Sequence, residues 1–207
     1  MGGGTVQQQS KRRAGSGFAV LEALAALCIL ALIASLAAVG FRRHVIAARA
    51  AEASAMLLEL AGKEQAFRAR AGHYTPLRAD NRGDLPSPDE DADAFYPQPA
   101  DSPSLASARV TTHLEDRDLW PPAWRAVALR PPTDLPHCTY LVNAADDGHP
   151  DPALAFGTKL IPAEVKGPWF YALAACNLDG PARYPGGVTV YGLSSENFTI
   201  RAFDEGR

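Results

Sequence analysis

The chain has 207 residues and a formal net charge of −3 at neutral pH. This length suffices for one membrane segment and one or two small globular units. The small net charge excludes a strong general attraction to nucleic acid, and no nucleic-acid partner is predicted. The 17 prolines and 17 glycines predict long irregular stretches between short elements.

The N-terminal segment, residues 1–17, is rich in glycine and glutamine and then basic at 11–13. It has no apolar periodicity and is not expected to fold by itself. An apolar run follows and ends at Phe41, with Glu22 as its one acidic residue. A run of roughly 20 apolar residues can cross a bilayer as a helix. A carboxylate inside such a run costs about 2.5–3.5 kcal/mol, so Glu22 is expected to have a function.

An ordinary secretory signal fits this apolar run poorly. The run exceeds the usual 7–15 residues, and it ends at Arg42 and Arg43 rather than at a small-residue cleavage site. A lipoprotein signal at Cys28 also fits poorly, because the large Leu27 precedes it and the run continues past it. Basic residues flank both ends of the run, so the lysine and arginine bias does not set the orientation.

The residues at the start of the run resemble a known processing motif. Gly17-Phe18 followed by Glu22, after a basic leader, is similar to the cleavage motif of type IV prepilins, although 19–21 departs mildly from that family's usual residues. The resemblance implies that a membrane peptidase cuts after Gly17 and methylates the Phe18 amine. It also implies a cytoplasmic N-terminus and pairing of Glu22 with the Phe18 amine of a neighbouring subunit. A plain, uncut single-pass anchor is the alternative.

The helix is predicted to continue beyond the membrane segment. Residues 18–41 form the transmembrane and filament-core part, and 42–71 form an amphipathic part rich in good helix formers. Gly72 and then Pro76 predict the end of the helix. The apolar side chains of the second part share one face and are expected to pack on a globular domain: Ala53, Met56, Leu57, Leu60 and Phe67.

Residues 72–137 contain most of the prolines and form a predicted connecting region. Short helical turns are expected at 114–119 and 123–129, and Trp120 and Trp124 are expected to anchor the region on the domain. Its acidic stretch, 80–93, is most simply a solvated loop, with calcium binding as the alternative.

Residues 138–207 are predicted to form a small antiparallel sheet, which makes the chain an α+β protein. Strands are expected at 138–143, 169–176, 188–193 and 198–203, in a meander with one face on the long helix. This arrangement resembles the C-terminal half of pilins. Cys138 begins the first strand and Cys176 ends the second, and these ends meet in an antiparallel pair. A disulfide is therefore expected, with two buried free thiols as the alternative.

The residues point to no active site, metal or cofactor, and the chain is not expected to be an enzyme. The five histidines lack metal-ligand spacing, and Ser194-Ser195 has no evident catalytic partner. A calcium site in the loops of the sheet domain is the alternative, but the spacing of its candidate ligands is loose: Asp146, Asp147, Asp151, Asn177 and Asp179.

The resemblance implies a structural subunit of a type IV pilus-like filament. Its implied partners are other pilin subunits, a prepilin peptidase and the inner-membrane assembly machinery. The implied location is the bacterial inner membrane before assembly and an extracellular or periplasmic filament afterwards. Major pilin, minor pilin and pseudopilin of a type II secretion system stay open, and the length of the chain favours a minor subunit. An uncut, membrane-anchored binding protein is the other class.

Overall fold

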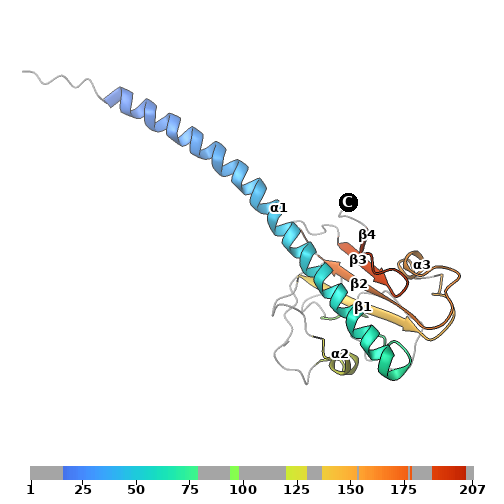
Figure 1. Cartoon of the computed structure of the whole chain (residues 1–207). Helices are drawn as coiled ribbons and strands as arrows, with labels where there is room; N and C mark the ends of the chain where they lie inside the picture. Colours follow the sequence, from blue (N-terminus) through green and yellow to red (C-terminus); the bar gives the residue numbers. More distant parts are fainter. Residues whose placement is uncertain are drawn as a thin grey trace, which may run out of the picture. The chain divides into compact units, whose positions relative to one another are not determined.

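The computed structural model describes residues 16–78, 94–97, 120–129, 137–152, 154–176, 178 and 188–203, with side chains from Val20 onward. It divides into two units, Met1–Val45 and Ile46–Arg207. The chain has the predicted α+β fold, in which the second half of a long N-terminal helix packs against a small antiparallel sheet (Figure 1).

Helix α1 extends from Ser16 to Ala71, beginning two residues before the predicted start at Phe18. Alanine and leucine, both strong helix formers, dominate its sequence. The helix ends as predicted, because Gly72 adopts a φ of +84° and its N–H donates to the Arg68 carbonyl over 2.8 Å. Glycine takes this left-handed conformation without the steric penalty of a Cβ atom, and it satisfies a carbonyl at the helix end.

The sheet contains four strands in the order β1-β2-β3-β4, and every pair is antiparallel. The strands are β1 Cys138–Ala145, β2 Trp169–Cys176, β3 Thr189–Ser194 and β4 Arg201–Phe203. The predicted meander is therefore confirmed. Strand β4 is shorter than predicted because the preceding residues form a turn instead. In that turn the Ser194 and Asn197 backbones exchange hydrogen bonds of 3.2 Å, and the Thr199 N–H donates to Asn197 Oδ1 over 2.8 Å.

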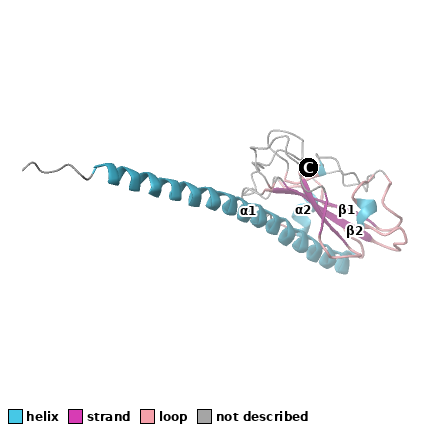
Figure 2. Cartoon of the chain, turned by 90° about the horizontal axis from the view of Figure 1, so that it is seen from above, coloured by secondary structure: helices cyan, strands magenta, loops and turns pink. Residues whose placement is uncertain are grey.

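One face of the sheet packs on the second half of α1 (Figures 1 and 2). Because side chains alternate along a strand, every second residue of β1 and β2 points to this side. The predicted apolar stripe of α1 is confirmed, since four of its members are fully buried and Phe67 is partly buried. The shared core includes Ala53, Met56, Leu57 and Leu60 from α1 with Tyr140, Val142, Phe170 and Ala172 from the sheet.

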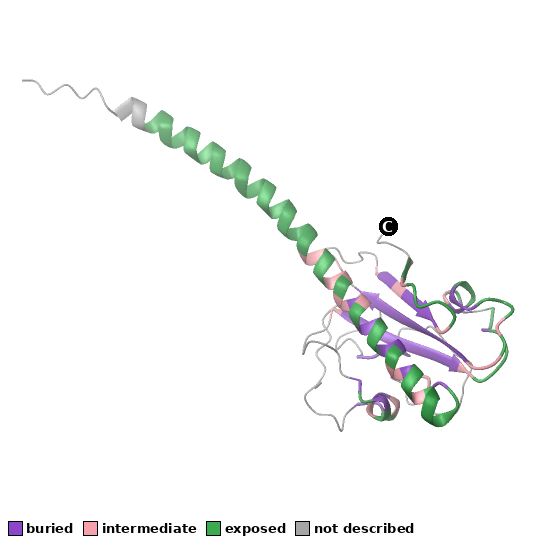
Figure 3. Cartoon of the chain, in the orientation of Figure 1, coloured by how far each residue is buried: buried purple, intermediate pink, exposed green. Residues whose placement is uncertain are grey.

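The opposite face of the sheet is also buried, which the sequence did not predict. Helix α3, Gly157–Leu160, and the segment around Phe95 cover it. The second core there includes Leu141, Trp169, Tyr171, Leu173, Leu160 and Ile161. Strand β2 is consequently buried along its whole length (Figure 3). The sheet is therefore covered on both faces, by α1 on one side and by α3 and the Phe95 segment on the other.

The connecting region contributes to the sheet domain at the points where it is described. Leu77 and Tyr96 each exchange two backbone hydrogen bonds of 2.7–3.1 Å with β1, so they cover its outer edge. Helix α2, Pro122–Val127, carries the buried Trp124, and Trp120 is buried just before it. The predicted anchoring by both tryptophans is confirmed. The turn predicted at 114–119 and the acidic stretch 80–93 lie outside the described residues.

Candidate functional site

The apolar half of α1 is exposed from Val20 to Phe41. Eleven large hydrophobic side chains in this half are 56–75% exposed, and their positions surround the helix. Among the described residues of the unit from Ile46 onward, the exposed large hydrophobic side chains are Leu58 and Phe198, at 52% and 44%. The most apolar 18-residue window of α1 has a mean hydropathy of 2.6, and none of it is buried. By length and composition, α1 can cross a membrane.

The predicted processing residues lie at the start of this half. Gly17 and Phe18 belong to the first turn of α1, and the side chain of Phe18 falls outside the described part. Glu22 is described and exposed, one turn further along the helix. Residues four apart lie on one face of a helix, so Glu22 shares a face with Phe18. The pairing of Glu22 with a neighbouring subunit's amine stays a prediction.

Cys138 and Cys176 form the predicted disulfide, so the alternative of two free thiols is wrong. They are direct partners in the β1–β2 register, with Cα atoms 4.2 Å apart, and both are buried. Cross-linking residues 38 positions apart stabilises a fold by roughly 3.5–4 kcal/mol in the chain-entropy model. Cys28, the third cysteine, is a free thiol in the apolar half.

Two charged side chains on one turn of α1 hold the chain on either side of the disulfide. Arg49 Nη1 donates to the carbonyl of Leu178, two residues after Cys176, over 2.7 Å. The backbone N–H of His137, the residue before Cys138, donates to Glu52 Oε1 over 3.4 Å. We call Arg49 and Glu52 the disulfide clamp. The clamp ties both cross-linked strand ends to the same place on the helix.

The surroundings of the clamp keep nearby titratable groups neutral. Burial lowers the pKa of His137, the charge of Arg49 lowers it further, and Glu52 acts in the opposite direction. Burial raises the pKa of Tyr140, and the negative charge of Glu52 adds to the effect. At neutral pH the imidazole is therefore uncharged and the phenol is protonated.

Glu64 is a buried carboxylic acid that the sequence analysis missed. Glu64 lies two turns before the C-terminal end of α1, and its side chain is 0% exposed. Its Oε2 accepts a 3.0 Å hydrogen bond from the Thr75 N–H, and its Oε1 is buried without a partner. Burial raises the pKa of Glu64 to about 8, although the bond from Thr75 acts against this shift. The signal was present in the sequence, because Glu64 continues the buried stripe of Leu57 and Leu60 at helical spacing.

Basic and aromatic side chains meet at the C-terminal end of α1, beside Glu64, where Arg68 is exposed and Tyr74 is buried. Arg68 Nη1 donates to the Tyr74 hydroxyl over 2.7 Å, and its guanidinium lies 4.8 Å from the centre of the same ring. Gln65 Nε2 donates to this hydroxyl over 3.2 Å. Tyr74 also packs edge-on against Phe170 of the sheet. These contacts and the Glu64–Thr75 bond fasten the chain that leaves α1 back onto the helix.

Three of the candidate calcium ligands, Asp146, Asp147 and Asp151, are exposed. Asn177 and Asp179 lie outside the described residues. Within the part of the chain that is described, no group of three or more His, Cys, Asp or Glu side chains could hold a metal ion. Ser194 and Ser195 serve the turn after β3, where Ser195 Oγ accepts a hydrogen bond from the Phe170 N–H.

Comparisons of the chain with protein-family models, with curated proteins and with solved structures gave no match.

Proposed function

We propose that this chain is a structural subunit of a type IV pilus-like filament. It enters the bacterial inner membrane as a prepilin with its N-terminus in the cytoplasm. A prepilin peptidase cuts between Gly17 and Phe18 and methylates the new amine. The subunit then assembles through the apolar half of α1 into a periplasmic or extracellular filament. The observation that supports this proposal best is the exposed apolar surface from Val20 to Phe41.

A helix that is apolar on all sides requires an apolar environment. Lipid supplies this environment before assembly, and the apolar helices of other subunits supply it in the filament. The same helix continues into a unit with its own core, so one element connects the assembly segment to a folded domain. This arrangement supports a subunit whose helices gather in the filament interior and whose sheet domains form its outer surface.

The acidic residue in the apolar half supports assembly rather than simple anchoring. A carboxylate in a membrane segment costs about 2.5–3.5 kcal/mol and serves anchoring poorly. Cleavage after Gly17 would create an α-amino group on Phe18, with a reference pKa of about 7.7–8. That amine is a cation at neutral pH, and it offsets the burial of the Glu22 charge when two subunits bring them together.

The disulfide supports export of the sheet domain. Disulfides persist in oxidising compartments such as the bacterial periplasm and are rare in the cytosol. Cys138 and Cys176 are buried and cross-linked. The implied partners are other pilin subunits, the prepilin peptidase and the inner-membrane assembly machinery. A secretion pseudopilin would share all of these features, and abundance in sheared surface filaments distinguishes a pilin from it.

Processing is the first test. We expect mass spectrometry of the membrane-bound protein to find Phe18, methylated, at the N-terminus. Gly17→Ala should leave the leader attached, because the peptidase of the resembled family requires the glycine, whereas Gly15→Ala is the control and should be processed normally. A wild-type chain with an uncut N-terminus would favour a membrane-anchored binding protein and overturn the proposal.

Assembly is the second test. Glu22→Ala should insert into the membrane and be processed, yet enter filaments far less than the wild type. Glu59→Ala, which removes an exposed carboxylate from the second half of the same helix, is the matched control and should assemble normally. Equal amounts of the Glu22→Ala and wild-type chains in sheared filaments would refute the role of Glu22.

A further inference from the structure

A pair of arginines follows the apolar half of α1 without an intervening residue. Arg42 and Arg43 come directly after Phe41, and both are exposed. We call this pair the basic collar. The stretch 23–51 contains no aspartate or glutamate, so it carries only positive formal charge. The collar is therefore a concentrated cationic surface on a helix that is otherwise apolar over the preceding turns.

We propose that the basic collar binds the phosphate groups of anionic lipids in the leaflet at the far end of the membrane segment. This inference rests on the membrane insertion that the proposed function includes. The partner is a lipid headgroup such as phosphatidylglycerol rather than a soluble phosphate, because the position of the collar along the helix places it at the headgroup layer.

Helix geometry gives that position. The segment 20–41 is about 33 Å long at 1.5 Å per residue, and the hydrocarbon core of a bilayer is about 30 Å thick. When this segment fills the core, its last residue, Phe41, lies at the edge of the hydrocarbon. Arg42 and Arg43 then lie at the level of the phosphates.

The direction of the side chains favours the same contact. In a helix each Cα–Cβ bond tilts toward the N-terminus, which for the collar is the direction of the membrane. The apolar stems of Arg42 and Arg43 can therefore cover the last apolar turn, while their guanidinium groups reach the headgroups. Guanidinium groups match phosphate oxygens with paired N–H donors.

The collar gains importance after processing. Removal of residues 1–17 takes away the three basic residues at 11–13, whereas Arg42 and Arg43 stay. The processed subunit then has its main cationic group on the far side of the membrane. Anionic lipids would hold it there at a defined depth, and this contact must break when the subunit leaves the membrane for the filament.

The test measures lipid selectivity in the full chain. The protein is reconstituted in equimolar phosphatidylcholine and phosphatidylglycerol vesicles and extracted gently, and native mass spectrometry measures the lipids that stay bound. All variants carry K11Q, R12Q and R13Q so that the leader does not contribute. We expect phosphatidylglycerol to be enriched by about fivefold for each arginine engaged.

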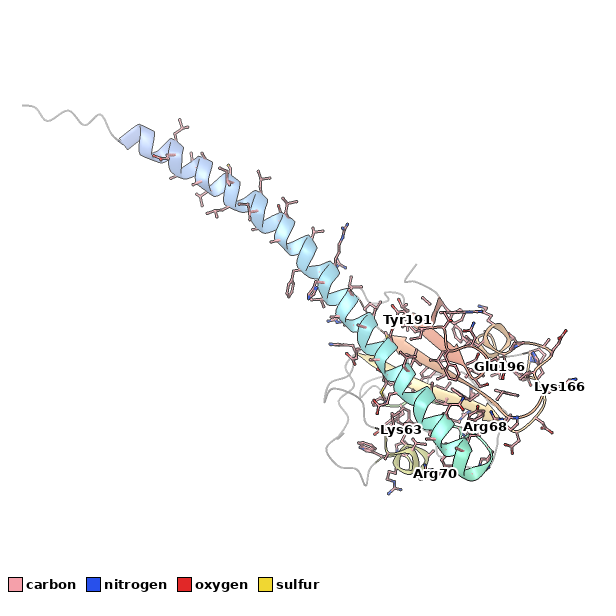
Figure 4. All side chains as sticks on the ribbon, in the orientation of Figure 1. Lys63, Arg68, Arg70, Lys166, Tyr191 and Glu196 are labelled. Atoms are coloured by element: carbon pink, nitrogen blue, oxygen red, sulfur yellow. A yellow bond between two sulfur atoms is a disulfide. The ribbon has the colours of Figure 1, made fainter. Side chains whose placement is uncertain are left out.

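The variants separate the collar from general charge. In R42Q/R43Q, the ratio of phosphatidylglycerol to phosphatidylcholine among the bound lipids should fall to the ratio in the vesicles. R42K/R43K should keep most of the phosphatidylglycerol enrichment. R70Q/K166Q is the matched control, because it removes two exposed cations from the other unit and should keep the full enrichment (Figure 4). The proposal would be overturned if phosphatidylglycerol were enriched equally in R42Q/R43Q and its parent. It would also be overturned if R70Q/K166Q lost as much enrichment as R42Q/R43Q.

Alkaline extraction distinguishes the failure of the two proposals. A parent chain that alkaline carbonate releases from the vesicles is not inserted, and this result would overturn both the proposed function and the collar. A parent chain that resists extraction but binds the two lipids in the vesicle ratio would overturn the collar alone.

Discussion

Replacing Glu64 by glutamine should make the protein more stable at alkaline pH while changing little at acidic pH. Glutamine has nearly the same shape, it stays neutral, and its Oε1 can accept the hydrogen bond that the Thr75 N–H donates to Glu64. The substitution therefore removes the titration of the buried group and keeps its main contact.

The magnitude follows from the pKa of Glu64, which rises from 4.5 to about 8 in the folded protein because the carboxyl is buried. Below pH 4.5 the group is protonated in both states and adds no pH dependence. Between pH 4.5 and 8 the folded state keeps a proton that the unfolded state releases, so the free energy of unfolding falls as pH rises. At 1.36 kcal/mol per pH unit, the total loss is about 5 kcal/mol as an upper value.

The assay is urea-induced unfolding of the full chain in detergent, followed by the fluorescence of the buried Trp124 and Trp169. The useful quantity is the free energy of unfolding of Glu64→Gln minus that of the wild type. Other titrating groups are common to both proteins and cancel in this difference. We expect it to rise from near zero at pH 4 to several kcal/mol at pH 9.

The control is Glu59→Gln, which changes an exposed carboxyl five residues earlier on the same helix. Its difference from the wild type should stay small at every pH. A difference for Glu64→Gln that stays within about 1 kcal/mol from pH 4 to pH 9 would refute the buried, proton-holding state of Glu64.

Two further predictions concern the sheet domain. Removing the disulfide clamp with R49Q/E52Q should increase the ratio of reduced to cross-linked Cys138–Cys176 at a fixed dithiothreitol ratio by about fivefold for each charged hydrogen bond lost, because each is worth about 1 kcal/mol or more. Thiol alkylation and mass spectrometry measure this ratio. R70Q is the control, and an unchanged ratio in R49Q/E52Q would contradict the role of the clamp. Gly157→Ala should destabilise the domain by about 1–3 kcal/mol in urea unfolding, because a Cβ there would lie 2.9 Å from Tyr171 Cε1. Gly62→Ala is its matched control, since a Cβ there meets nothing within 4 Å; equal stability of the two variants would rule out the close approach of Gly157 to the ring.

Local patterns in the sequence determined much of this fold. The apolar run, the helical spacing of Met56, Leu57 and Leu60, and Gly72 at the helix end together predicted α1, because helix periodicity and termination depend on nearby residues. The apolar, β-branched and aromatic runs predicted four strands and their antiparallel order. The two cysteines lie at opposite ends of two consecutive strands. An antiparallel meander brings these two ends together, so the disulfide could also be predicted from the sequence.

Only the tertiary structure decided how the sheet is covered and which polar groups are buried. Phe95 lies 74 residues before the start of β2, and no local pattern in the sequence predicts that Phe95 and α3 pack on the second face of the sheet. The clamp likewise joins α1 to residues far along the chain, Leu178 and His137. Glu64 shows most clearly what the sequence alone could not decide. Its spacing places it on the buried stripe, but a carboxyl group favours water, and only the packing of the sheet and the Thr75 N–H decide that it is buried.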